Sequence, residues 1–269
     1  MLYKPPESGP KILLVDIETA PMLGYIWGLW DNNVALNQLH TDWYVLSWAA
    51  KWLGAPDEEL MYQDQRNSPD IMDDSILLNG IWHLLNESDI VIGQNSKRFD
   101  TKKLNARFIL NGYSPPAKYR QIDTLETAKR RFAFSSNKLE YLTEKLCTKN
   151  KKLKHKKYPG FELWRACMQR DLEAFDEMKD YNKVDVLALE ELYLIFRPWM
   201  DNHPNLNVYI EGPELVCHKC GSDSLHKRGF AYTNLGKYQK WRCICGSETR
   251  DRVNLLTKEK RTSLQANIV

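Results

Sequence analysis

Apolar and polar positions in the first part of the chain alternate between strand-like and helix-like patterns. Apolar runs at residues 11–17, 43–54 and 89–95 predict three largely buried strands. Apolar residues three and four positions apart at 75–88, 101–112 and 170–196 predict helices, and the last segment is long enough for one helix or two in succession. Because strands and helices are interspersed, the pattern predicts an α/β fold.

Capping signals support these helices. Gly112 follows the pattern at 101–112 as a C-cap glycine would. Residues 123–132 open with an Asp-x-x-Glu arrangement that is typical of a helix N-terminus. We therefore interpret Asp123 as a helix cap and not as a metal ligand.

Length and composition limit the class of protein. The chain has 269 residues, of which 43% are hydrophobic, enough for one substantial core and a small second module. No apolar run approaches the roughly 20 residues that span a bilayer, and residues 1–10 do not resemble a signal peptide. We expect an intracellular, cytoplasmic protein that does not contact a membrane.

Charge is divided unequally along the chain. Residues 213–269 carry 11 Lys and Arg against 5 Asp and Glu, a net charge of +6, whereas residues 1–212 have a net charge of −3. The segment 197–214 contains three prolines and few helix signals. We predict a main domain over residues 1–204, a small module over 205–250 and a basic, poorly ordered tail over 251–269.

Acidic side chains stand where the predicted strands end and on the last helix. Asp16 and Glu18 follow the first apolar run and, two apart on a strand, point to the same face. Asp100 follows the third strand, and Tyr181 and Asp185 share one face of the last helix. Unpaired carboxylates are costly to bury, so this set is a candidate cation site.

The order of these residues resembles the three motifs of the DEDDy branch of the DnaQ-like 3′-to-5′ exonucleases. The motifs here are Asp16-x-Glu18, Asn95-x-x-x-Phe99-Asp100 and Tyr181-x-x-x-Asp185. Residues 121–146 are also similar to the helical segments of family B polymerase proofreading domains and of bacterial and phage stand-alone relatives. The resemblance spans about residues 11–196 and implies a ribonuclease H-like mixed sheet flanked by helices.

The resemblance also implies a role for each motif residue. Asp16, Glu18, Asp100 and Asp185 would bind two Mg²⁺ or Mn²⁺ ions, and Tyr181 would orient the attacking water, a role that a histidine has in the sister branch. Carboxylate oxygens suit these cations, which can activate water and stabilise the charge that develops during phosphodiester hydrolysis. Taken alone, each acid is more often a solvated surface residue, but the ordered set favours catalysis.

Two features outside the motifs fit a nucleic-acid substrate. Residues 149–157 carry six lysines, which would attract phosphates without reading bases, although such charge runs are usually only a solvated surface. Trp27, Trp30 and Trp48 offer surfaces for base stacking. Core packing is nevertheless the expected role of most tryptophans in the chain.

Four of the six cysteines cluster in the basic module. Cys217-x-x-Cys220 and Cys243-x-Cys245 flank a turn-rich segment, a spacing that predicts a tetrahedral thiolate site for one structural Zn²⁺. The segment resembles a zinc ribbon. Its second pair has one intervening residue where ribbons usually have two, so His218 or His226 is an alternative ligand.

The resemblance and these features together imply a metal-dependent 3′-to-5′ exonuclease that releases nucleoside monophosphates. Single-stranded DNA is the expected substrate because the nearest resemblance is to proofreading domains. Basic residues interleaved with Tyr232, Tyr238 and Trp241 favour nucleic acid as the ligand of the ribbon, with a protein partner as the competitor. A polymerase or another replication or repair protein is an expected partner in trans. RNA is the alternative substrate, and a non-catalytic nucleic-acid-binding adaptor is the alternative function.

Overall fold

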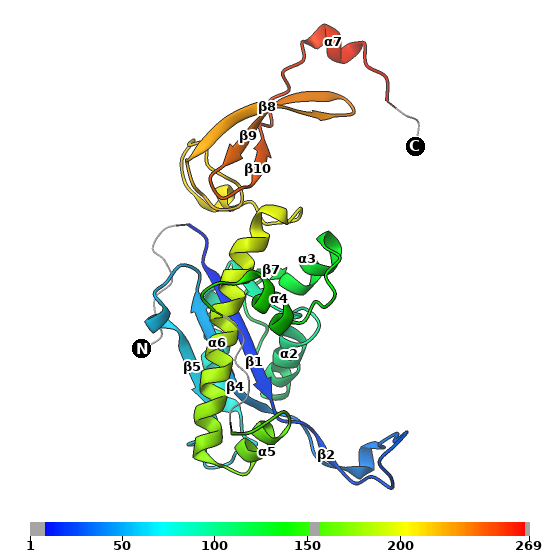
Figure 1. Cartoon of the computed structure of the whole chain (residues 1–269), viewed down its shortest axis with the longest axis vertical. Helices are drawn as coiled ribbons and strands as arrows, with labels where there is room; N and C mark the ends of the chain where they lie inside the picture. The colour runs from blue at the N-terminus through cyan, green and yellow to red at the C-terminus, as the bar shows by residue number, and fades with distance from the viewer. Residues whose placement is uncertain (1–8, 151–156, 267–269) are drawn as a thin grey trace. The chain divides into compact units, whose positions relative to one another are not determined.

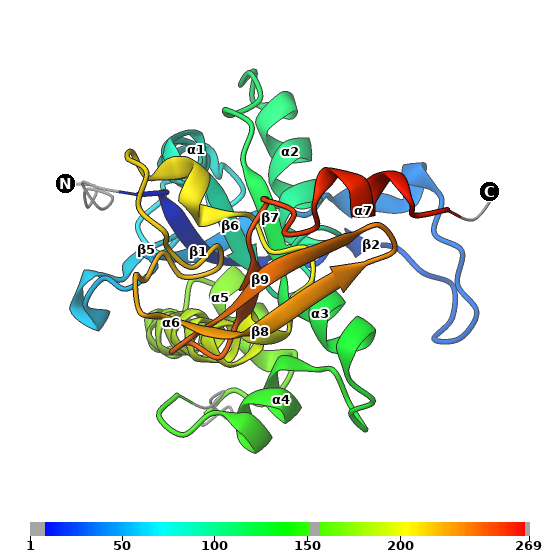
Figure 2. The same ribbon diagram turned by 90° about the horizontal axis from the view of Figure 1, so that it is seen from above.

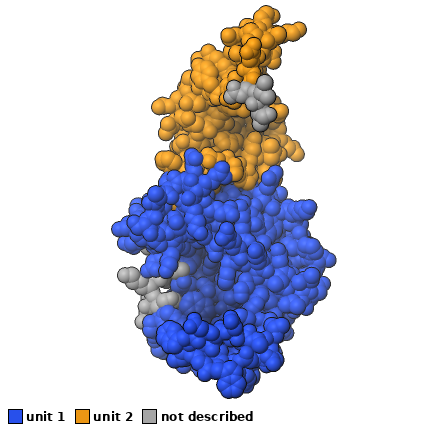
Figure 3. Space-filling model, turned by 90° about the vertical axis from the view of Figure 1, so that its right-hand side faces the viewer, with its two compact units in different colours: residues 1–7, 11–195 blue, residues 8–10, 196–269 orange. Residues whose placement is uncertain are grey.

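The computed structural model describes residues 9–150 and 157–266 and divides the chain into two compact units (Figure 3). The first unit contains Lys11–Ile195, and the second begins at Phe196. Residues 151–156, which hold most of the predicted lysine-rich loop, lie outside the described residues. The functional division at residues 204 and 250 stays a prediction.

A five-stranded mixed sheet in the order β5-β4-β1-β6-β7 forms the centre of the first unit (Figure 1). The central strand β1 pairs antiparallel with β4 and parallel with β6. The strands are β1 (Ile12–Thr19), β4 (Val45–Trp52), β5 (Met61–Asp64), β6 (Ile90–Gly93) and β7 (Arg120–Asp123). The three predicted strands are confirmed as β1, β4 and β6, and the short edge strands β5 and β7 were not predicted.

Helices cover both faces of the sheet (Figure 2). Helices α1 (Ser75–Glu87) and α2 (Asp100–Leu110) pack against the face to which Leu13, Val15 and Ile17 of β1 contribute. Helices α5 (Glu162–Met168) and α6 (Leu172–Phe196) pack against the opposite face. Because neighbouring residues of a strand point to opposite faces, the residues of β1 that alternate with this apolar set face α5 and α6.

Three more helices of this unit are short. They are η2 (Asp57–Glu59), α3 (Thr124–Arg131) and α4 (Leu139–Leu146). Helix α6 is one continuous helix of 25 residues and not two. None of the helices within the described residues is both long and apolar enough to cross a bilayer. The unit thus has the predicted α/β fold, a mixed sheet flanked by helices.

An arm with exposed aromatic side chains joins β1 to β4. It contains β2 (Leu23–Gly24), η1 (Leu36–Gln38) and β3 (Leu39–Thr41). On this arm Trp27 is 98% and Trp30 is 86% exposed, whereas Trp48 of β4 is 1% exposed and packs in the core. Core packing therefore accounts for Trp48 but not for the two tryptophans of the arm.

The second unit contains a three-stranded antiparallel sheet in the order β10-β9-β8. Its elements are η3 (Arg197–Trp199), η4 (Leu206–Tyr209), β8 (Leu225–Thr233), β9 (Gly236–Cys243), β10 (Glu248–Arg250) and α7 (Lys258–Thr262). After β10, the backbone N–H groups of Asp251 and Leu255 donate hydrogen bonds to the carbonyls of Gln239 and Lys237. These two hydrogen bonds and α7 lie within residues 251–269, and the poor order predicted for this tail stays a prediction.

Candidate functional site

Three carboxylates converge where β1 meets α6. One oxygen atom from each of Asp16, Glu18 and Asp185 lies within 4.8 Å of the other two. Strand β1 presents Asp16 and Glu18 on the face that α6 covers, and Asp185 extends from that helix. Asp185 is buried, and Asp16 and Glu18 are half-buried. The site is therefore acidic and only partly open to water.

Uncharged hydrogen-bond donors orient two of these carboxylates. Asn182 Nδ2 donates to Asp16 Oδ2 at 2.6 Å, and Ser47 Oγ donates to Asn182 Oδ1 at 3.1 Å. Trp164 Nε1, on α5, donates to Glu18 Oε2 at 3.1 Å. These uncharged donors hold the carboxylates of Asp16 and Glu18 in position.

Tyr181 lies on α6 one turn before Asp185 and is buried. Its ring packs edge-on against the indole of Trp164, with the ring centroids 6.0 Å apart and an interplanar angle of 80°. The same indole donates to Glu18. Trp164 thus connects the aromatic residue of the third motif to an acid of the first.

Asp100 occupies a different position from the other acids. Among the described residues, the group of carboxylates within 4.8 Å of one another includes Asp16, Glu18 and Asp185 but not Asp100. Asp100 Oδ1 accepts a hydrogen bond from the backbone N–H of Ile17 at 3.1 Å, which keeps it next to the strand that carries the first motif. Burial raises the pKa of Asp100 to about 7.

Comparison with known proteins identifies the family of the first unit. Residues 53–196, more than half of the chain, match the family model described as the RNase H superfamily. The chain belongs to the RNase H superfamily. The matched residues include Asp100, Tyr181 and Asp185, whereas Asp16 and Glu18 lie before them on β1.

Solved structures show the same fold. The chain is similar to the family B DNA polymerase from the hyperthermophilic archaeon Pyrobaculum calidifontis, with a TM-score of 0.50 and 14% sequence identity over 73% of this chain. The match covers 25% of the polymerase, so this RNase H superfamily chain corresponds to about a quarter of that protein. A search of curated proteins gives no match.

Asp123 caps α3, as its sequence context predicted. Its Oδ1 accepts hydrogen bonds from the backbone N–H groups of Leu125 and Asn95, both at 2.9 Å. Asn95 has a φ of +62°, a left-handed conformation that asparagine tolerates better than most residues. The Asp123 carboxylate therefore holds the turn that leads from β6 to Asp100.

A cavity of about 540 Å³ lies beside this turn. Six of its eight lining residues are of polar type, two of them lysines: Gln94, Asn95, Leu125, Lys129, Asn137, Lys138, Leu139 and Glu140. Gln94 and Asn95 directly follow β6, which pairs with β1. The cavity thus lies at the end of β6, the immediate neighbour of the strand that carries Asp16 and Glu18.

The four predicted cysteines come together in the second unit. The sulfur atoms of Cys217, Cys220, Cys243 and Cys245 all lie within 4.8 Å of one another. The Cys217–Cys245 and Cys220–Cys243 pairs are 3.8 and 3.5 Å apart. Tetrahedral zinc with Zn–S bonds of about 2.3 Å requires sulfur atoms about 3.8 Å apart. The cluster therefore has the dimensions of a zinc site.

Turns after each cysteine pair shape this cluster. Gly221 has a φ of +74° and Gly246 a φ of +88°, conformations that favour glycine. Among the described residues, the group of potential zinc ligands consists of the four cysteines. It does not include His218 or His226, the two histidines considered as alternatives. The shortened spacing of the second pair is thus compatible with a set of four sulfur atoms.

Sequence reasoning missed three residues that support the acidic site. Asn182 directly follows Tyr181 of the third motif, which is the one signal that the sequence offers, and its burial on α6 is seen only in the structure. Ser47 is a lone hydroxyl within an apolar strand, a pattern that indicates a buried hydrogen bond but not its partner. Trp164 lies outside every motif and reaches Glu18 only through the tertiary fold.

Proposed function

We propose that the first unit is a metal-dependent 3′-to-5′ exonuclease of the DEDDy type. The observation that supports this proposal most is the convergence of Asp16, Glu18 and Asp185 within an RNase H superfamily fold. Carboxylate oxygens are the ligands that Mg²⁺ and Mn²⁺ prefer. Two such ions, when bound, would supply an activated water and stabilise the charge that develops on the phosphate.

The residues of the site have two kinds of role in this proposal. Asp16, Glu18 and Asp185 would hold the cations, and Asp100, on α2, would complete the set of ligands. Tyr181 orients the attacking water. The products are nucleoside monophosphates released from the 3′ end.

Single-stranded DNA is the proposed substrate. The cavity next to β6 has two lysines and several amide groups in its lining, which suit a nucleotide with its phosphate. Trp27 and Trp30 expose rings on which unpaired bases can stack. The similarity to a DNA polymerase favours DNA over RNA.

The second unit is proposed to be a zinc ribbon. Four cysteine sulfur atoms at these distances suit one structural Zn²⁺. The ribbon would hold the substrate strand, and a polymerase or another replication or repair protein acting in trans stays a predicted partner.

A labelled oligonucleotide tests the function. Single-stranded DNA and RNA of one sequence, each with a 5′ label, are incubated with the full chain and Mg²⁺ or Mn²⁺. We expect a ladder that shortens from the 3′ end, faster on DNA, and no shortening after the divalent ions are removed. Faster shortening of RNA would identify an exoribonuclease. Binding of both strands without cleavage would identify an adaptor.

Trp164→Phe should lower the rate of hydrolysis and the apparent affinity for Mn²⁺ by about tenfold. Loss of a hydrogen bond to a metal ligand typically lowers metal affinity or activity by about 10–100-fold. The phenyl ring preserves an aromatic contact with Tyr181 but removes the donor to Glu18. Activity measured against Mn²⁺ concentration gives both quantities.

Trp82→Phe is the matched control. It removes a similar indole hydrogen bond, from Nε1 to the carbonyl of Ser114 at 2.8 Å, outside the acidic site. If both variants have the same Mn²⁺ dependence as the wild type, the Trp164 contact does not position a metal ligand.

A further inference from the structure

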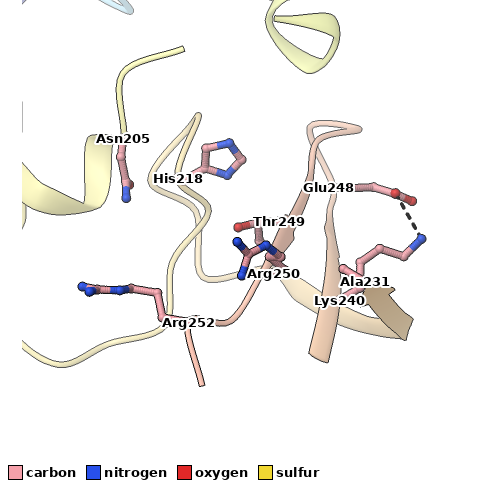
Figure 4. Close-up of a pocket in the computed structure, with 8 residues that line it drawn as sticks. All are labelled: Asn205, His218, Ala231, Lys240, Glu248, Thr249, Arg250 and Arg252. Carbon is pink, nitrogen blue, oxygen red and sulfur yellow. Dashed lines mark ion pairs between the residues drawn. The ribbon is translucent and has the colours of Figure 1, made fainter. Parts of the chain in front are cut away.

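A pocket of about 450 Å³ lies on the three-stranded sheet of the second unit (Figure 4). All of its lining residues belong to that unit: Asn205, His218, Ala231, Lys240, Glu248, Thr249, Arg250 and Arg252. The pocket shares no lining residue with the acidic site of the first unit, and its lining carries a net positive charge.

The strand register explains why cations gather here. Lys240 of β9 is paired with Arg250 of β10, and Arg242 with Glu248, so these four side chains share one face of the sheet. Tyr238 lies on the same face, two residues before Lys240.

Positive charge exceeds negative charge in this pocket. Lys240, Arg250 and Arg252 line it, against one carboxylate, Glu248. That carboxylate is 3.3 Å from Lys240 and is also within 4 Å of Arg242 and Arg228. Among the described residues, the ion pairs of Glu248 involve Lys240, Arg242 and Arg228 but neither arginine of the lining, so Arg250 and Arg252 are available to an anion.

Two contacts hold the Arg250 side chain in place before any ligand binds. The guanidinium of Arg250 lies over the ring of Tyr238 at 4.1 Å from the centroid, and Nη1 donates to the carbonyl of Asp251 at 3.2 Å. In Figure 4 the Lys240–Glu248 pair lies on one side of the view, and the guanidinium groups of Arg250 and Arg252 lie away from it, nearer His218 and Asn205. His218 Nδ1 is buried without a hydrogen-bond partner among the described residues.

We propose that this pocket binds a backbone phosphate of single-stranded nucleic acid. A planar guanidinium can donate two hydrogen bonds to one phosphate, and contacts to phosphates position a strand without reading its sequence. The half-buried ring of Tyr238 carries the Arg250 guanidinium over its face and so fixes the group that would contact the phosphate. The inference rests on the proposed function in taking the nuclease substrate as the ligand.

Binding measurements on the full zinc-loaded chain test the pocket. The fluorescence anisotropy of a short labelled single-stranded DNA is followed at several salt concentrations without added divalent ions. The variant Arg250→Gln/Arg252→Gln should bind about tenfold more weakly, and the slope of log K against log salt should fall by about 0.7 for each phosphate that the variant no longer neutralises. Arg252→Gln alone, at an exposed position, should show a smaller effect in the same direction.

Lys258→Gln/Lys260→Gln on α7 is the control, because it removes the same charge from exposed positions outside the pocket. It should leave affinity and salt slope near the wild-type values. Zinc content and melting temperature are measured for each variant to show that the unit is intact. An equal effect of both double variants, or no effect of either, would overturn the proposal.

Competitors identify the ligand. Unlabelled single-stranded DNA should displace the probe at far lower concentration than inorganic phosphate, a nucleoside monophosphate or polyglutamate. If one of these three competes equally well, the pocket is a phosphate monoester site or a general anion site, and the proposal fails. Hydrolysis is assayed separately with Mn²⁺. Binding that depends on the pocket but leads to no cleavage would contradict the proposed function and not this inference. Cleavage of a strand whose binding does not depend on the pocket would contradict this inference and not the proposed function.

Discussion

Asp185→Asn is expected to reduce 3′-end hydrolysis by at least about 10³-fold, equivalent to about 4 kcal/mol of transition-state stabilisation. The substitution preserves the shape of a buried side chain on α6 while removing one of the three converging charges. A neutral amide is a much weaker ligand for Mg²⁺ or Mn²⁺ than a carboxylate. The rate of release of nucleoside monophosphates from single-stranded DNA measures the effect.

Asp180→Asn provides the control for this substitution. Asp180 is exposed on the same helix, so the change removes the same charge from α6 without touching the acidic site. This variant should retain nearly full activity. If Asp185→Asn remained as active as Asp180→Asn, the carboxylate cluster would not be the catalytic centre.

Removal of zinc should unfold the second unit and leave the first unit folded. Most residues of β8 are exposed, and the buried residues of the unit include Cys217 and Cys243 themselves, so its apolar core is small. Structural zinc contributes about 10 kcal/mol or more to the folding of comparable modules. Chelation or Cys220→Ser should therefore abolish the structure of the β8–β10 sheet.

Hydrogen exchange of backbone amides distinguishes the two units in one experiment. Without zinc, protection should disappear from β8 and β9 but persist in β1, β4 and β6. Cys147→Ala is the control, because Cys147 is buried outside the cluster and its replacement should leave one zinc bound. Persistent protection of β8 and β9 in the metal-free protein would show that zinc is not required for folding.

Local patterns predicted the centre of the first unit. Strands β1, β4 and β6 are apolar because they are buried between two helical layers. Such apolar runs can be recognised in the sequence without knowledge of the tertiary structure. The alternation along β1 also placed Asp16 and Glu18 on one face. The long helical pattern placed Tyr181 and Asp185 one turn apart, and the fold brings Asp185 to the acids of β1.

Features that depend on long-range contacts were not predictable in this way. Strands β5 and β7 have only four residues each, and pairing with their neighbours decides their conformation. The exposure of Trp27 and Trp30 on the arm opposes the usual preference of tryptophan for partial burial. Trp164 and Ser47 support the site through partners more than one hundred residues away, as the Trp164–Glu18 separation of 146 residues shows.

The measurement that tests the central claim most directly is anomalous diffraction from crystals of the full chain soaked with Mn²⁺ and a nucleoside monophosphate. Data recorded at the manganese edge locate the ions independently of any assay. The account predicts two manganese peaks bound by the carboxylates of Asp16, Glu18 and Asp185, with the nucleotide phosphate beside them. Ordered nucleotide with no manganese at these carboxylates would contradict it.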